Sequence, residues 1–475
     1  MKSHRKYIAI FFLALSGFFI LFLSILLKGI IFNILVQVDN DLFTQFLLAR
    51  ERLREDTKAV YSDVVIVGID DRTLNKLGVY SPQKYRRYHI DVLANILEGQ
   101  PKAVVYDILF GDSHDDPDVD RKLSEVMKKG HVFSVCFGSN HDRSGGMFKP
   151  LGFDIPQNLN MTFESEKGFE PILPAIFNSL EGTGLANVYP DRDGMLRKAP
   201  VFFNVNEKLY STIAFEVFRK INGIPHSEIL IENGKITSGG TKIPVDNYCR
   251  AYINIDKKHR IREISFYDVW AGRVPGRFFR DKVVFMAATA TGLGDMKLVP
   301  LYGYIAGVRI HANLLLNLIY KNFIREISGK YYYILIFLAS LFYTYIFYMR
   351  RELSPFKMIT NYISDIGIVT KAGEIILKIP VLNRSYGVIK KKGEKSYGLK
   401  IFFLVFSEIR QRLAPLLVHL VILYLALFLI FYQLNIYIKP SAVMIQLLIS
   451  YIVVLEFKRI NFSEILPAGK SSQSP

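Results

Sequence analysis

The sequence predicts an α/β extracytoplasmic domain, with a mostly parallel sheet and flanking helices, together with four transmembrane α-helices. Three observations predict this fold class. Half of the 475 residues are hydrophobic although the formal net charge is +17, which indicates that apolar and charged residues are segregated along the chain. Uncharged runs of about 20 residues, long enough to cross a bilayer as helices, occur near both ends. Between them, apolar strand patterns alternate with amphipathic helical patterns, as in parallel sheets covered by helices.

The first two spans enclose the long middle of the chain. The run at 7–27 carries no charge, is too long for a signal-peptide core and lacks an Ala-x-Ala cleavage site, so we expect it to stay as a span. The run at 331–349 ends at Arg350 and Arg351, and basic residues mark the cytoplasmic side of a span. We therefore predict that residues 35–328 lie outside the cytoplasmic membrane.

The third and fourth spans should form a hairpin because only a short turn joins them. The loop 350–412 before them holds 13 basic and 5 acidic residues, which is typical of the cytoplasmic side. This topology explains much of the net charge, so no nucleic acid is needed as a partner. Within the loop, 401–413 has the pattern of an amphipathic helix, and its basic surroundings favour membrane lipid. The predicted order, all at the inner membrane, is cytoplasmic residues 1–6, span 7–32, domain 35–328, span 331–349, cytoplasmic insert 350–412, spans 414–432 and 436–456, and cytoplasmic tail 457–475.

The middle of the chain has the pattern of one α/β domain with a less regular part at 137–170. Buried strands rich in Val and Ile alternate with helices in which apolar residues recur at helical spacing. The only two cysteines are Cys136 and Cys249, and two buried free thiols are favoured over one disulfide between them. The predicted strands are 63–70, 102–110, 131–137 and 282–287, and the predicted helices are 89–99, 119–130, 212–221 and 265–270.

Acidic residues collect where the predicted strands end. Asp70 follows the first strand and Asp107 ends the second, and ligands of open parallel sheets bind beyond the carboxyl ends of the strands. The acidic stretch 112–120 could supply oxygen ligands for Mg²⁺ or Ca²⁺ in a metal-dependent hydrolase. The competing interpretation is helix capping by Asp118 or Asp120, since an Asp side chain bonds free backbone N–H groups at a helix start. We assign no metal site.

The stretch 189–200 begins like a calcium loop, at Asp191 and Asp193, but lacks the Glu that closes an EF-hand loop. We therefore predict a turn between strands, in which Gly194 takes a positive φ and Arg197 pairs with a nearby acid. Elsewhere the domain has neither the P-loop nor the dinucleotide-binding glycine pattern, and no Ser–His–Asp or Cys–His arrangement is indicated. The sequence therefore predicts no catalytic residue and no cofactor.

Five fragments carry a family resemblance. They are VVIVGIDDRTLNKLG, AVVYDILFGD, GTGLANVYPDRDGMLRKAPV, ISFYDVWAGRVPGRFFRDKVVFMAATATGLGDMKLVP and GVRIHANLLLNLI. Together they cover about residues 40–325 and resemble CHASE2, the second type of the cyclase/histidine-kinase-associated sensory extracellular domain. The block 281–315 is the most specific. The resemblance implies a bacterial outer sensory domain with one span before it and three after it, followed in the family by a cytoplasmic cyclase or kinase.

The chain departs from this family at three places. The Trp-Pro-Trp-Pro-Arg run after the first strand is replaced by VYSPQKYRRYH, which keeps Pro82 and has a basic residue at Arg86. The final strand ends in Ala-Ala-Thr instead of Gly-Ala-Thr. Only about 20 residues follow the fourth span, whereas a catalytic domain needs on the order of 100. The insert 350–412 is therefore either a docking surface for a separate cytoplasmic output protein or a solvated loop that follows the positive-inside rule.

The function predicted from these observations is that of a transmembrane sensor or receptor, and not of an enzyme. The expected ligand-binding residues are Asp70, Asp107, Asp295 and His311, which lie on the strand-end rim and face an extracytoplasmic ligand that the sequence does not identify. Two other classes stay open: a metal-dependent envelope hydrolase and a non-catalytic membrane scaffold. A second copy of the chain, in a homodimer, stays open as a further partner.

Overall fold

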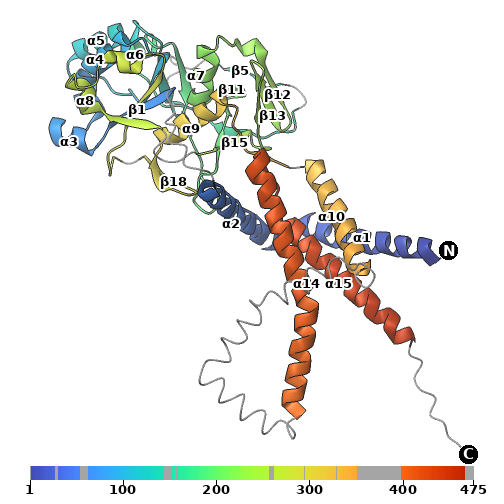
Figure 1. The fold of residues 1–475 in the computed structure, drawn as a ribbon. Coiled ribbons are helices and arrows are strands. Elements are labelled where there is room, and N and C mark those ends of the chain that lie inside the picture. Colours follow the sequence, from blue (N-terminus) through green and yellow to red (C-terminus); the bar gives the residue numbers. More distant parts are fainter. Residues whose placement is uncertain are drawn as a thin grey trace, which may run out of the picture. The chain divides into compact units, whose positions relative to one another are not determined.

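The structure, a computed structural model, describes residues 2–26, 30–53, 63–143, 152–156, 159–255, 261–293, 295–327, 329–349 and 397–465. It divides into two compact units (Figure 1). The domain unit comprises Phe43–Glu326 and Leu434–Tyr437, and the helical unit comprises Met1–Leu42, Ile327–Gln433 and Ile438–Pro475. The short segment Leu434–Tyr437 therefore belongs to the domain unit, although the chain on both sides of it belongs to the helical unit.

A six-stranded parallel sheet forms the centre of the domain unit, with the strand order β16-β1-β17-β2-β3-β8. Its strands are β1 (Val64–Ile69), β2 (Ala103–Asp107), β3 (Val132–Cys136), β8 (Gly182–Leu185), β16 (Arg262–Ser265) and β17 (Val283–Ala288). Every residue of β1 and β3 is buried, because the Val-rich strands of a parallel sheet are covered on both faces. The predicted α/β domain with a mostly parallel sheet is confirmed.

Helices cover both faces of this sheet. Val64 and Ile66 belong to one hydrophobic core and Val65 and Val67 to another, since successive side chains of a strand point to opposite faces. Among the helices with side chains in the first core are α7 (Ile213–Ile221) and α9 (Val308–Ile319), and among those in the second are α4 (Pro82–Glu98), α5 (Pro117–Met127) and α8 (Phe266–Trp270).

Smaller sheets, mostly antiparallel, occupy the chain between these elements. The described residues of the predicted irregular part 137–170 contain four of their short strands. Cys136 and Cys249 are both buried free thiols, as predicted. The further strands are β4 (Gly138–Ser139), β5 (Phe153–Asp154), β6 (Glu164–Glu166), β7 (Gly168–Phe169), β9 (Lys198–Pro200), β10 (Phe202–Val205), β11 (Lys208–Ser211), β12 (Ile229–Glu232), β13 (Lys235–Ser238), β14 (Thr241–Pro244), β15 (Arg250–Tyr252), β18 (Met296–Val299) and β19 (Gly303–Ala306). The further helices of the domain unit are α3 (Asp71–Leu77), α6 (Pro174–Phe177), η1 (His226–Glu228) and η2 (Gly276–Phe279).

Long helices make up the described part of the helical unit. They are α1 (Lys2–Leu26), α2 (Ile30–Leu53), which continues into the domain unit, α10 (Gly329–Met349), α14 (Tyr397–Leu434) and α15 (Pro440–Ile465). Among the described residues, Gly329–Met349 and Leu416–Leu434 are long and apolar enough to cross a membrane, whereas Tyr7–Phe19 and Pro440–Leu455 are shorter apolar stretches. The second and third predicted spans thus have matching helices, and the first and fourth stay predictions.

A polar contact joins three of these helices. Ser340 of α10 is fully buried and donates from its hydroxyl to the carbonyl of Ala14 in α1 at 2.8 Å. Gln446 of α15 donates to the Ser340 hydroxyl at 2.8 Å. Side-chain hydrogen bonds of this kind hold apolar helices together where water cannot bind the polar groups.

Two boundaries differ from the sequence-based expectation. The segment 401–413, expected as an amphipathic helix on the membrane, is continuous with the third predicted span in α14, since no Gly or Pro occurs from 401 to 414 and the helix continues through Pro415. The predicted first span 7–32 is shared by two elements, since α1 ends at Leu26 and α2 begins at Ile30. Residues 350–396 of the predicted insert lie outside the described residues.

Candidate functional site

Three of the four predicted ligand-binding residues interact electrostatically at the carboxyl edge of the sheet. Asp107 ends β2 and is half-buried, and His311 of α9 is 4% exposed. Asp295, directly before β18, carries a charge that acts on both of these side chains. Lys297 of β18 pairs with Asp295 at 2.7 Å, and its charge also acts on both. We call Asp107, Asp295, Lys297 and His311 the rim cluster.

The environment of the rim cluster sets its protonation. Burial, together with the negative charge of Asp295, raises the pKa of Asp107 from 3.8 to about 7, although Lys297 opposes the rise. Burial lowers the pKa of His311 from 6.5 to about 4, although Asp295 favours the protonated ring. Near neutral pH the cluster therefore offers a titrating carboxyl and a neutral imidazole, beside the Asp295–Lys297 ion pair. Perturbed groups of this kind gather at functional sites more often than elsewhere.

Asp70 stands apart from the rim cluster and has a structural role. It is the N-cap of α3, where its carboxylate accepts the backbone N–H of Thr73 at 2.8 Å and the Thr73 hydroxyl at 2.7 Å. The Ser265 hydroxyl donates to the same carboxylate oxygen at 2.8 Å. Asp is a preferred residue at helix N-caps, so the position of Asp70 is explained without a ligand.

Sequence reasoning missed Lys297, because a lone Lys in a short hairpin has no pattern of its own. The structure also explains Gly307, which follows the hairpin β18–β19. Its backbone N–H donates to the Asp295 carbonyl at 2.7 Å, and a Cβ there would lie 1.8 Å from the Asp295 carboxylate oxygen Oδ2. Glycine at this position therefore lets the Asp295 carboxylate lie against the backbone.

The acidic stretch 112–120 is occupied by capping and ion pairing. The N-cap of α5 is Asp116, not Asp118 or Asp120 as predicted, because the helix starts at Pro117, two residues before the predicted start at 119. Asp120 pairs with the fully buried Arg86 at 2.5 Å, and Asp118 pairs with Arg121 on the surface. In the described part of the chain, no group of three or more His, Cys, Asp and Glu side chains is placed to hold a metal ion.

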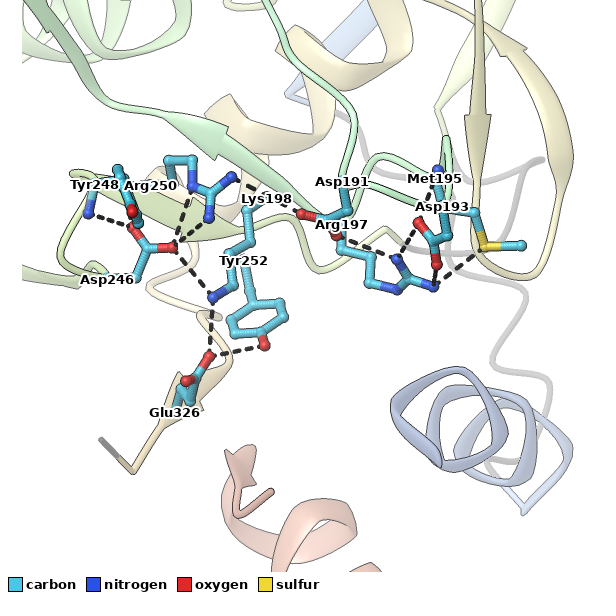
Figure 2. A network of polar contacts seen from close by, with 10 residues as sticks. All are labelled: Asp191, Asp193, Met195, Arg197, Lys198, Asp246, Tyr248, Arg250, Tyr252 and Glu326. Atoms are coloured by element: carbon cyan, nitrogen blue, oxygen red, sulfur yellow. Dashed lines mark hydrogen bonds and ion pairs between the residues drawn. The ribbon is translucent and has the colours of Figure 1, made fainter. Parts of the chain in front are cut away.

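Figure 2 shows a charged network that begins at the turn predicted from Asp191 and Asp193. Gly194 has φ +80°, and Arg197 donates to Asp191 at 3.1 Å and to Asp193 at 2.7 Å, so these two parts of the prediction are confirmed. We also expected the Asp191 side chain to bond the backbone, whereas the Asp193 carboxylate accepts the Met195 backbone N–H at 3.1 Å. Arg197 is 3% exposed. Although burial favours the protonated form of Asp193, the hydrogen bonds from Arg197 lower its pKa. The turn is therefore held as an ion-paired structure.

The network continues to Glu326, the last residue of the long segment of the domain unit (Figure 2). Lys198 donates to Asp246 at 3.2 Å and to Glu326 at 2.9 Å. The Tyr252 hydroxyl donates to the same Glu326 carboxylate at 2.8 Å, and Arg250 pairs with Asp246 at 3.0 Å. Glu326 therefore receives two donors from the interior of the domain unit.

Glu326 also belongs to a second structure, which we call the junction. Strand β20 (Arg325–Glu326) pairs in parallel with strand β21 (Ile436–Tyr437), which lies between α14 and α15 in the chain. Arg50 of α2 has no exposed surface and donates to Asn254 Oδ1 at 2.6 Å and to Asn435 Oδ1 at 3.2 Å. The junction consists of the two strands and these three side chains, and all of it belongs to the domain unit.

Aromatic packing closes the junction. Tyr437 is 1% exposed, and its ring centroid lies 4.9 Å from that of Phe43 and 6.2 Å from that of Tyr252. The backbone N–H of Arg325 donates to the Asn435 carbonyl at 2.8 Å. A shift of β20 must therefore change the contacts of β21, and the chain continues from β21 into α14 on one side and α15 on the other.

The comparisons with known proteins agree with this architecture. A family model described as the CHASE2 domain matches residues 17–345, which includes the whole parallel sheet. Searches of curated proteins and of solved structures found no match. The chain therefore belongs to the CHASE2 domain family, a family of extracellular sensory domains.

Proposed function

We propose that this chain is a four-span sensor of the inner membrane, with its domain unit outside the cytoplasm and both ends inside. The observation that carries the proposal is the junction. A turn between two spans usually needs no partner, whereas β21 pairs with β20 and buries Tyr437 in the domain unit. This connection gives a conformational change of the domain a direct route to α14 and α15.

The rim cluster is our candidate for the site that detects a small molecule or an envelope partner. Its support is the place of Asp107 beyond the carboxyl end of a parallel strand, where ligands of such sheets bind. A ligand changes the state of a sensor only if it binds two conformations with different affinity. We expect those conformations to differ in the contacts of Asp107, Asp295 and Lys297.

The output is proposed to be a separate cytoplasmic protein that docks at the insert 350–412, next to anionic membrane lipid. We propose no catalytic activity, no cofactor and no nucleic-acid partner for this chain. We propose a homodimer, in which the helices α14 and α15 of two copies signal together. Positive charge in the insert supports the cytoplasmic placement.

Photo-crosslinking from the insert tests this proposal in living cells. A photoreactive amino acid at position 391 should capture a cytoplasmic protein, and the yield should change when Asp107→Asn alters the rim cluster. The change should disappear when Asn435→Ala and Tyr437→Ala open the junction. A capture pattern that is identical in all of these variants would favour a static scaffold over a sensor. The exposed substitution Val79→Ala serves as the control, since 82% of Val79 is exposed.

A further inference from the structure

A cleft of about 310 Å³ lies in the domain unit, where the edge strand β8 meets α6, α7 and the end of β11. Small-molecule sites begin at about this volume. Gly184 of β8 keeps the strand close to the start of α7, because a Cβ there would lie 2.5 Å from the Ile213 Cα atom. Backbone of an edge strand therefore lines the cleft together with charged side chains of α7.

A buried ion pair forms part of the cleft wall. Glu216 and Arg219 are each 7% exposed, and Arg219 donates to the two carboxylate oxygens at 2.6 and 3.1 Å. The Ser211 hydroxyl donates to Glu216 at 3.0 Å, and Arg219 also donates to the Ile224 carbonyl at 2.8 Å. Arg219 uses three of the five N–H donors of its guanidinium in these contacts, and the Glu216 carboxylate accepts three of about four possible hydrogen bonds. The pair can therefore bind another molecule. Stability alone gives little reason for the pair, since apolar replacements of buried ion pairs are often neutral or stabilising.

Further charges of both signs line the cleft beside apolar side chains. Lys220 and Glu181 form a wide ion pair at 3.4 Å, and their side chains are 35% and 39% exposed. Burial and the charge of Arg219 lower the pKa of the half-buried His226. Phe177 and Leu180 add an apolar wall. The cleft thus combines paired positive and negative groups with a small hydrophobic surface.

We propose that this cleft binds a small zwitterion, an α-amino acid or a dipeptide. The ligand carboxylate bonds Arg219 and Lys220, and the ligand ammonium bonds Glu216 and Glu181. Each ligand charge then has a partner, which a partly buried charge requires. The cleft shares no residue with the rim cluster, so this inference goes beyond the proposed sensor function and can fail without it.

Calorimetry and thermal unfolding of the full chain in lipid nanodiscs test the inference with the standard L-amino acids and with L-alanyl-L-leucine as probes. At least one probe should bind at millimolar concentration and raise the melting temperature. The amide of that probe, which lacks the carboxylate, and its N-acetyl form, which lacks the ammonium, should each bind about tenfold more weakly or worse. If no probe binds, or if either derivative binds as tightly as its parent, the inference is wrong.

Matched variants locate the binding. Glu216→Gln combined with Arg219→Met removes both buried charges together and should weaken binding about tenfold or more. The control, Glu232→Gln with Lys235→Met, removes an exposed ion pair of the same i,i+3 spacing and should leave binding unchanged. Should the first variant fail to fold, the partly exposed Lys220→Met must weaken binding instead. Binding that is lost in Asp107→Asn but kept in the cleft variants would place the probe at the rim cluster and overturn the inference.

Discussion

Replacing Arg50 with Met should loosen the junction while filling most of the same space. The wild-type guanidinium is fully buried and donates to Asn254 at 2.6 Å and to Asn435 at 3.2 Å. A hydrogen bond from a charged donor contributes about 1.5–3 kcal/mol, and the two amide oxygens would lose these donors. Removing a buried charge offsets part of that loss. We therefore expect the free energy of opening the junction to fall by about 2–3 kcal/mol, which is about a 30-fold to 150-fold increase in opening.

Hydrogen exchange of the full chain in nanodiscs measures this change. The reporter is the backbone N–H of Arg325, which donates to the Asn435 carbonyl at 2.8 Å and exchanges only when the junction opens. Peptides that contain β20 and β21 should exchange faster in Arg50→Met by the factor above. Arg52→Met is the control, because Arg52 lies on the same helix but is exposed. Equal exchange in wild type and Arg50→Met would refute the view that Arg50 holds the junction.

Three further results are expected. The unfolded chain releases the Asp107 proton near pH 3.8 and the folded chain near pH 7, so wild type should lose stability as pH rises through this window. The melting temperature of Asp107→Asn should fall less over the same pH range. An equal fall of the melting temperature in both proteins would contradict the raised pKa. Gly99→Ala should lower the free energy of unfolding by about 2–3 kcal/mol, because its Cβ would lie 1.9 Å from the Gly276 carbonyl oxygen. A melting temperature equal to that of wild type would show that the backbone segments at Gly99 and Gly276 move apart at little cost. Cysteines at the register partners Arg325 and Ile436 should form a disulfide on mild oxidation in membranes, since paired positions of neighbouring strands are about 5 Å apart, and failure to crosslink would argue against β20–β21 pairing.

The parallel sheet was predictable because its central strands are continuous apolar runs. Strands β1, β2, β3 and β17 are rich in Val, Ile and other apolar residues, and burial on both faces gives them a pattern that helices of similar length rarely share. The edge strands β8 and β16 were missed, since Gly-Thr-Gly-Leu and Arg-Glu-Ile-Ser have no such pattern. Their pairing depends on the rest of the sheet and not on local propensity.

The rim cluster was predictable only in part. Asp107 follows from its place at a strand end, whereas Lys297 comes to Asp295 through the hairpin β18–β19. Asp70 has the same strand-end signal as Asp107, yet it caps α3. A strand end thus predicts where polar side chains gather, but the following residues decide whether an Asp turns back to cap a helix.

The junction was not predictable from local sequence. Strands β20 and β21 have two residues each and are more than 100 positions apart in the chain. A segment such as Asn435–Tyr437 has the pattern of an ordinary turn between two helices. Only tertiary contacts, above all those of the buried Arg50 and Tyr437, give it a defined place.

The extracytoplasmic placement of the domain unit is the central claim, and cysteine labelling in spheroplasts tests it most directly. Burial raises the pKa of both native thiols, Cys136 and Cys249, to about 12, so they should not react with a membrane-impermeant maleimide. We predict that Val79→Cys, at a position 82% exposed, is labelled in intact spheroplasts, and that Lys391→Cys in the insert is labelled only after permeabilisation. Labelling of Val79→Cys only after permeabilisation would place the domain in the cytoplasm and contradict the account.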